Sequence, residues 1–198
     1  MIYIDDRINE YPESDITRWT AELPWQRRER VEAIRHDAGR RQSLLSYRLL
    51  CRALREEYGI TEPPTFTYNE HGKPFLTETD GRHLHFSLSH CREAVCCVVS
   101  ERSCGIDIEC PRRVPDSVIH YAMNEEEQAL IDRAGRDGEE KERMQLFLRL
   151  WTRKEAVLKL EGTGIRDTMK DVLVGCPYDI ETRESDRWTM SIALSKPE

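Results

Sequence analysis

Apolar residues recur at helical spacing in several parts of the chain. Residues 37–58 carry them at intervals of three and four, which predicts an amphipathic helix. Gly59 follows, and glycine is the residue that most often ends a helix. Further helices are expected after Pro24, over 125–134 with Asn124 as the N-cap, and over 139–160 with Gly162 and Gly164 behind it.

Shorter alternating runs predict strands. Leu84, Phe86 and Leu88 alternate with polar residues, as expected of a half-buried strand. Helices and then strands occur twice along the chain, which predicts an α+β protein with an N-terminal half, 1–102, and a C-terminal half, 103–198, in one compact two-lobed unit. The strands are expected at 2–6, 65–68, 83–88, 93–100, 105–109, 171–176 and 188–195.

Composition narrows the possible partners. The 198 residues include 37 acidic and 30 basic side chains, and the net charge of −7 argues against a general nucleic-acid binder. No apolar run approaches the roughly 18 residues that span a bilayer. The start, MIYIDDRINE, lacks the basic and apolar regions of a signal peptide, so we expect a cytoplasmic protein without a membrane partner.

The charge is unevenly distributed. Between Trp25 and Arg55 the chain has nine arginines and three acidic residues. This excess predicts either a solvated helix face or a basic surface that holds phosphates or an acidic partner.

The seven cysteines do not indicate a metal site, because no C-x-x-C pair occurs. We expect buried, reduced thiols, with Cys96 and Cys97 on opposite faces of one strand. Cys91 follows His90 directly, but adjacent side chains tend to point apart, which disfavours a cysteine–histidine catalytic pair.

Carboxylates supply the first candidate chemistry. In C-G-I-D-I-E-C, Asp107 and Glu109 would share one face of a strand, with their Cα atoms about 7 Å apart. Glu155 lies on the apolar stripe of the long helix, where an unpaired carboxylate is costly to bury, and Lys159 follows one turn later. Water, this lysine or a divalent cation would each compensate the charge. Three carboxylates on rigid elements suit Mg²⁺, which commonly bridges to substrate phosphates.

Two turns supply candidate phosphate ligands. Ser89 and His90 end the alternating strand in F-S-L-S-H, where a turn would present the histidine to a phosphate. In N-E-H-G-K-P, Gly72 and Pro74 form a turn that exposes Lys73. Taken separately, each feature is also typical of an ordinary structural position.

The four motifs together resemble the 4′-phosphopantetheinyl transferase superfamily. G-K-P, F-S-L-S-H, G-I-D-I-E and W-T-R-K-E-A, with a lysine four residues after the glutamate, occur in that order between residues 24 and 164. The length and two-half organisation resemble the larger, pseudo-dimeric type that activates surfactin synthetase and other peptide and polyketide synthetases. This resemblance implies two similar halves related by pseudo-two-fold symmetry, with the active site between them, in a monomer.

The resemblance also implies the reaction. The enzyme would move the phosphopantetheine arm of coenzyme A onto a serine of an acyl or peptidyl carrier protein, as a holo-[acyl-carrier-protein] synthase does. Adenosine 3′,5′-bisphosphate would leave, and Mg²⁺ or Mn²⁺ would be required.

Each matching residue receives a role from the family. Asp107, Glu109 and Glu155 would hold the metal, and Glu155 would alternatively be the base that activates the serine. Lys159 would contact the phosphates or the leaving group. The resemblance assigns Lys73, Ser89 and His90 to coenzyme A, Arg27 and Arg30 to its 3′-phosphate, and Glu127 to assistance at the metal site.

Two departures from the family pattern concern the adenosine side. Cys91 stands where a serine is common, and Gln42 or Arg41 stands near a family arginine. Two other functions are compatible with the same scaffold: a non-catalytic module that binds coenzyme A or a carrier protein, and another Mg²⁺-dependent enzyme such as a nucleotide hydrolase. The intact acids disfavour the first, and the lack of a glycine-rich phosphate loop disfavours the second.

Overall fold

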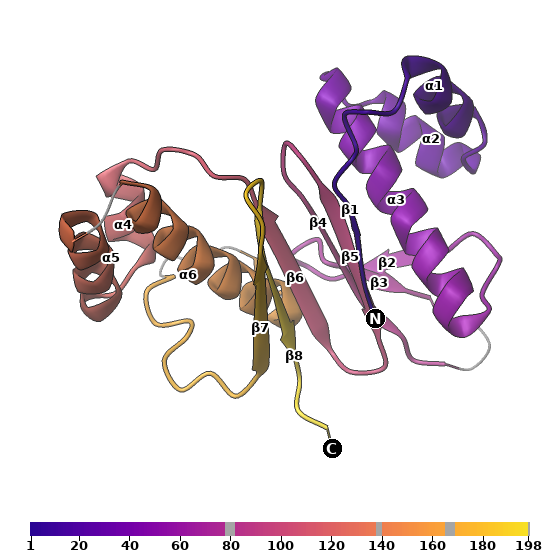
Figure 1. Cartoon of the computed structure of the whole chain (residues 1–198). Helices are drawn as coiled ribbons and strands as arrows, with labels where there is room; N and C mark the ends of the chain where they lie inside the picture. The colour runs from indigo at the N-terminus through magenta and orange to yellow at the C-terminus, as the bar shows by residue number, and fades with distance from the viewer. Residues whose placement is uncertain (78–81, 138–139, 165–168, 198) are drawn as a thin grey trace.

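The computed structural model describes residues 1–77, 82–137, 140–164 and 169–197. Its described residues form a mixed α+β fold with three small antiparallel sheets, as predicted for the fold class (Figure 1). None of the described helices is both long and apolar enough to cross a membrane.

The N-terminal part of the chain is built around one three-stranded sheet. The sheet has the order β1–β5–β4, and the long helix α3 (Asp37–Tyr58) packs against it. The stripe on α3 faces the core as predicted, and Gly59 ends this helix with a left-handed φ of 69°. The other elements are β1 (Ile2–Asp5), α1 (Glu13–Ala21), α2 (Trp25–Glu32), the hairpin β2 (Phe66–Tyr68) and β3 (Pro74–Leu76), β4 (His85–His90) and β5 (Val95–Ser100).

The C-terminal part has a second three-stranded sheet, in the order β6–β8–β7. The long helix α6 (Glu140–Glu161) packs against β6 and β8 on one side and against α5 on another. Figure 1 shows α6 running from α5 toward the strands of this sheet. The remaining elements are β6 (Cys104–Glu109), α4 (Asp116–Ala122), α5 (Glu125–Asp137), β7 (Asp179–Glu184) and β8 (Thr189–Leu194).

Two serine side chains join the sheets. The backbone N–H of Ile106 donates to Ser87 Oγ at 3.1 Å, and that of Ile108 donates to Ser89 Oγ at 3.4 Å. Residue numbers rise together along β4 and β6, so these strands run side by side in the same direction. The hydroxyls therefore fix the level at which β4 meets β6.

The cysteines behave as ordinary buried residues. All seven are free, and five of them are buried. Cys96 packs into the core around β6 and β8, whereas Cys97 packs into the core around α3, which confirms that they point to opposite faces. His90 is exposed and Cys91 is buried, so this pair also points apart.

One predicted strand is wrong. Residues 171–176 form successive turns, in which Val174 N donates to Asp171 O and Cys176 N donates to Leu173 O. Gly175 adopts a positive φ of 62°, which an extended strand does not allow. The strand of this region comes later, at β7.

Candidate active site

The site begins with a close approach between strand β6 and helix α6. A Cβ atom added at Gly105 would lie 2.0 Å from the carbonyl oxygen of Ala156 and 2.5 Å from the backbone nitrogen of Leu160. Only a residue without a side chain therefore lets the backbone of α6 rest on β6 at this level. The approach brings Glu155 and Lys159 of α6 next to Asp107 and Glu109 of β6.

Asp107 is the centre of the polar contacts. Its side chain is buried, and its Oδ1 atom accepts hydrogen bonds from Ser89 Oγ at 2.9 Å and Lys159 Nζ at 2.7 Å. Lys159 Nζ also donates to Ser89 Oγ at 2.8 Å. Residues from β4, β6 and α6 thus meet at one carboxylate. The ion pair of Lys159 is with Asp107 of β6. A simple pair with Glu155, one turn earlier on the same helix, is not formed among the described residues.

The remaining oxygen of Asp107 is unusual. Oδ2 is buried and has no hydrogen-bond partner among the described residues. A buried carboxylate oxygen without a donor costs free energy, so this atom is suited to a cation or a donor supplied by a ligand.

Two of the acids, Glu109 and Glu155, have raised pKa values. Burial, and then the Asp107 charge, raise the pKa of Glu109 above its usual value, although Arg112 and Lys159 oppose this effect. Burial and the Asp107 charge also raise the pKa of Glu155 to about 6. Burial alone would lower the pKa of Lys159, but the Asp107 carboxylate outweighs it and raises that pKa. The negative charge of Asp107 therefore acts on both Glu109 and Glu155.

The acids do not form a closed coordination shell. In the described part of the chain, no three His, Cys, Asp or Glu side chains are gathered as metal ligands. The chemistry of the donor set nevertheless fits Mg²⁺, since mutually repelling carboxylates and the unpartnered Asp107 Oδ2 are both stabilised by a hard cation. The assignment of Asp107, Glu109 and Glu155 to a metal stays a prediction.

The raised pKa of Glu155 gives a test that needs no turnover. A pKa of about 6 in the folded protein, against 4.5 for the free side chain, means that the charge destabilises the metal-free fold by about 2 kcal/mol above pH 6. Glu155→Gln should therefore stabilise the metal-free protein by up to about 2 kcal/mol at pH 7.5.

This gain should vanish below pH 4.5, where Glu155 is protonated in both the folded and the unfolded states. Urea unfolding in chelator at both pH values measures it. A variant equally stable at pH 7.5 would show that neither burial nor the Asp107 charge disfavours the Glu155 carboxylate.

A pocket of about 320 Å³ lies beside these residues. Glu155 and Lys159 line one part of it, and the apolar side chains of Phe86, Leu88 and Leu158 line another. The loop between β2 and β3 closes a further side with residues 71–74. The pocket thus offers a charged end and an apolar surface to one ligand.

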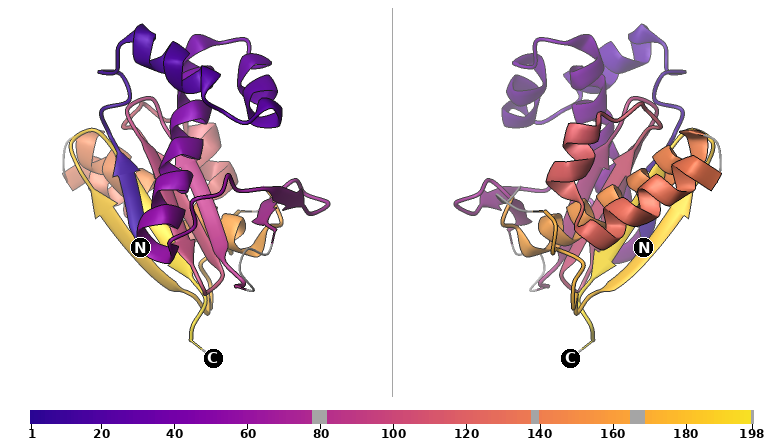
Figure 2. Two further views of the ribbon diagram at one scale, coloured as in Figure 1. Left: turned by 90° about the vertical axis from the view of Figure 1, so that its right-hand side faces the viewer. Right: turned by 90° about the vertical axis from the view of Figure 1, so that its left-hand side faces the viewer.

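The loop with Lys73 is fastened to the end of α6. Asn69 Oδ1 accepts the backbone N–H of Lys73 at 2.8 Å, and Asn69 Nδ2 donates to Gly162 O at 2.9 Å. Lys73 Nζ donates to Leu160 O at 2.7 Å, where a cation complements the C-terminal end of the helix. Burial lowers the pKa of Lys73. Figure 2 shows this hairpin projecting beside the chain that follows α6.

His90 lies at the end of β4, next to Ser89. The residue is exposed, but its pKa is lowered by partial burial of the ring and by the Lys159 charge. The Asp107 charge opposes this shift without cancelling it. Its neighbours therefore place His90 at the edge of the cluster formed by Asp107, Ser89 and Lys159.

The two predicted 3′-phosphate arginines lie elsewhere. Arg27 donates to the carbonyl and the hydroxyl of Ser43, and its guanidinium lies 5.0 Å from the ring centroid of Tyr47. The guanidinium of Arg30 lies 4.9 Å from the ring centroid of Tyr68. Both arginines line a pocket of about 300 Å³ that shares no lining residue with the pocket at Glu155.

Arg41 and Gln42 of α3, the residues near the family arginine, make contacts within the protein. Gln42 Nε2 donates to Cys91 O at 2.9 Å. Arg41 donates to the carbonyl groups of Ile8 and Tyr11 and pairs with Glu13. Both residues tie α3 to neighbouring segments.

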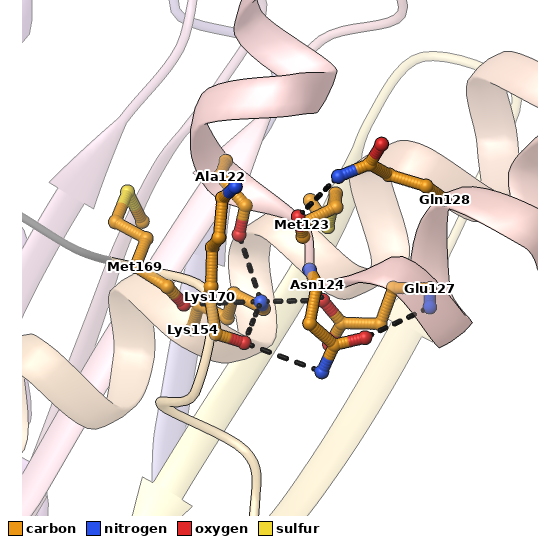
Figure 3. A network of polar contacts seen from close by, with 8 residues as sticks. All are labelled: Ala122, Met123, Asn124, Glu127, Gln128, Lys154, Met169 and Lys170. Carbon is orange, nitrogen blue, oxygen red and sulfur yellow. Dashed lines mark hydrogen bonds and ion pairs between the residues drawn. The ribbon is translucent and has the colours of Figure 1, made fainter.

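Glu127 has a different environment from the one expected near the metal acids. Its Oε2 atom accepts from Lys154 Nζ at 2.6 Å and from the backbone N–H of Asn124 at 2.9 Å (Figure 3). Asn124 Oδ1 accepts the N–H of Glu127 in return, so the two residues form a reciprocal cap at the start of α5. The N-cap prediction is confirmed.

Sequence reasoning assigned no role to three residues whose contacts hold elements together: Gly105, Asn69 and Lys154. The glycine of G-I-D-I-E was a signal for close backbone approach. Nothing in the sequence indicated that Asn69 would reach Gly162, because the contact spans 93 residues. The sequence did hold a signal for Lys154, because this charged residue lies close to the apolar residues Ala156 and Val157.

Comparison with known proteins agrees with the motif order. A model of the 4′-phosphopantetheinyl transferase superfamily matches residues 103–195. The 4′-phosphopantetheinyl transferase AcpT of Salmonella typhi is 31% identical over 163 residues, which cover 80% of this chain and 78% of that protein. This chain therefore belongs to the 4′-phosphopantetheinyl transferase superfamily.

Two further relatives carry the same description. The 4′-phosphopantetheinyl transferase Sfp of Bacillus subtilis is 24% identical over 165 residues, or 83% of this chain and 70% of that protein. The 4′-phosphopantetheinyl transferase gsp of Aneurinibacillus migulanus is 31% identical over 125 residues, or 63% of this chain. The match with gsp spans about half of that relative, 49% of its length.

Proposed function

We propose that this protein transfers the 4′-phosphopantetheine arm of coenzyme A to a serine of an acyl or peptidyl carrier protein. Adenosine 3′,5′-bisphosphate is the leaving product. The observation that carries the proposal is the contact of Lys159 Nζ with both Asp107 Oδ1 and Ser89 Oγ, which joins the three motifs of β4, β6 and α6 beside a pocket.

The acids would hold the metal. Asp107, Glu109 and Glu155 provide oxygen donors of the kind that Mg²⁺ and Mn²⁺ accept. When bound, the ion would neutralise charge that develops on the pyrophosphate oxygens of coenzyme A. The support is the unpartnered Asp107 Oδ2 and the raised pKa values of Glu109 and Glu155.

The other residues bind and move protons. The serine oxygen of the carrier attacks the β-phosphorus, the bond from this phosphorus to the bridging oxygen breaks, and the bisphosphate leaves. Glu155, whose pKa burial and the Asp107 charge raise to about 6, would be either the third ligand of the metal or the base that accepts the serine proton. Lys159 donates to the phosphate oxygens, and Lys73, Ser89 and His90 hold the pyrophosphate.

The finer architecture is part of the same proposal. The division into halves at residues 102 and 103 is supported by the separate sheets and by the family match to 103–195. A monomer with its site between pseudo-symmetric halves suits the meeting of β4 and β6. The arginine-rich α2 and α3 suit acidic carriers, and Arg27 and Arg30 would bind the 3′-phosphate from their own pocket.

A direct assay tests the function. Purified protein, coenzyme A and Mg²⁺ are incubated with apo fatty-acid, polyketide and peptide carriers, and each carrier is weighed by intact mass spectrometry. One added phosphopantetheine per carrier is expected, with none in chelator. Coenzyme A binding without transfer to any carrier would instead identify a non-catalytic module, and release of inorganic phosphate from nucleotides would identify a hydrolase.

A further inference from the structure

Lys154 is a charged residue that the proposed reaction does not use. It lies in the middle of α6, one residue before Glu155, and its side chain has no exposed surface. Burial of this kind lowers the pKa of an ammonium group and costs free energy unless every donor is satisfied. A purely apolar side chain would fill this position without that cost.

The ammonium group reaches four oxygen atoms on three segments. Nζ lies 2.8 Å from Ala122 O at the end of α4 and 2.6 Å from Glu127 Oε2 on α5. It also lies 3.0 Å from Met169 O and 2.9 Å from Lys170 O, both beyond the end of α6 (Figure 3). One side chain therefore binds α4, α5 and residues 169–170 to the middle of α6.

These contacts lie close to the residues of the site along the same helix. Successive helical residues differ by about 100° in direction, so Lys154 faces α5 while Glu155 faces the pocket. Met169 is fully buried and packs in one cluster with Leu158, which lines the pocket. Contacts on both sides of α6 therefore fix how far the helix is rotated toward β6.

We propose that Lys154 is a positioning residue: its ammonium clamps α4, α5 and residues 169–170 to α6 and thereby orients Glu155 and Lys159 toward the coenzyme A pocket. The capping pair of Asn124 and Glu127 holds the carboxylate that completes the clamp. The activity arm of this inference rests on the proposed function, whereas its structural arm does not.

The test separates positioning from stability. Lys154→Met removes the ammonium and leaves the Glu127 carboxylate buried without its cation, so the melting temperature should fall. The double variant Lys154→Met/Glu127→Met removes that carboxylate as well and should regain most of the loss, because apolar replacements of buried ion pairs are often tolerated.

Binding of coenzyme A with Mg²⁺, measured by calorimetry, should be weaker by about 10–100-fold in both variants, as is usual when residues that orient ligands are lost. Binding that recovers together with the melting temperature, or that never weakens, would overturn the proposal. Arg149→Met is the matched control. Arg149 lies on α6, like Lys154, but pairs with Glu184 of β7, so this variant should leave binding unchanged.

A second measurement works without activity. Hydrogen exchange at the Gly162 amide, which donates to Leu158 O, should accelerate in Lys154→Met more than global destabilisation explains. If Lys154→Met does not fold, Glu127→Gln, which keeps the shape and weakens the clamp, carries the same two measurements. A wild-type protein that modifies no carrier would refute the proposed function, whereas unchanged exchange at Gly162 would refute the clamp.

Discussion

Asp107→Ala is expected to reduce transfer to a carrier protein by about 1,000-fold or more, since single groups that stabilise charge in a polar site contribute about 10²–10³. The substitution removes the acceptor shared by Ser89 and Lys159, together with the unpartnered Oδ2 atom. The metal donor set and the orientation of Lys159 are lost at once. Intact mass of the carrier after timed incubation measures the effect, and circular dichroism checks that the fold is retained.

Two controls isolate the carboxylate. Asp107→Asn keeps the shape and one acceptor oxygen but removes the charge, so a comparable loss would assign the effect to charge and metal binding. Asp179 lies on β7 and pairs with Arg102, so Asp179→Ala removes an aspartate outside the site and should leave transfer unchanged. Calorimetric titration with Mn²⁺ should show weakened binding in the Asp107 variants alone. Wild-type transfer by Asp107→Ala would refute the role of the acid.

The elements with strong periodicity were predictable. The predicted bounds of α3 agree with the structure, and α6 and β6 agree to within a residue or so over their described parts. Each of these elements buries one face against a neighbour, so the apolar pattern in the sequence directly reflects the packing.

Weakly patterned segments were not predictable. Helices α1 and α4 and strand β3 escaped notice because they are short and partly exposed. Residues 171–176 resemble a buried strand by composition, but Val172 and Leu173 pack against α6 from a series of turns. An apolar run indicates that its residues are buried, but it does not indicate which backbone conformation they adopt.

The candidate site shows the same division. The motifs indicated Asp107, Glu155 and Lys159, because charged residues in apolar stretches require a partner, and the structure brings these residues together. The assignment of Arg27 and Arg30 to the 3′-phosphate came from the family resemblance alone. These arginines line a separate pocket. Contacts between distant residues, such as Ser89 with Lys159, depend on how β4 meets β6 and carry no local signal.

Gly105→Ala is expected to be the most damaging substitution of a residue that contacts no substrate. The added Cβ would lie 2.0 Å from Ala156 O and 2.5 Å from Leu160 N, and both atoms belong to the backbone of α6. Neither atom has a rotamer through which it could move away, so the helix must shift from β6. Overpacking of this kind costs about 3 kcal/mol or more. A shift of about 1 Å at Glu155 and Lys159 would reduce kcat/KM by about 100-fold.

Gly135→Ala provides the matched control, because the nearest atom to its added Cβ is Arg143 Cδ, which belongs to a flexible side chain. Alanine is also favoured over glycine inside α5 by about 1 kcal/mol, so this variant should be as stable as the wild type or more so. Urea unfolding and carrier modification at a temperature where all proteins are folded separate the two effects. Normal stability and transfer in Gly105→Ala would mean that α6 does not rest on β6, and the convergence of Asp107, Glu155 and Lys159 would lose its structural basis.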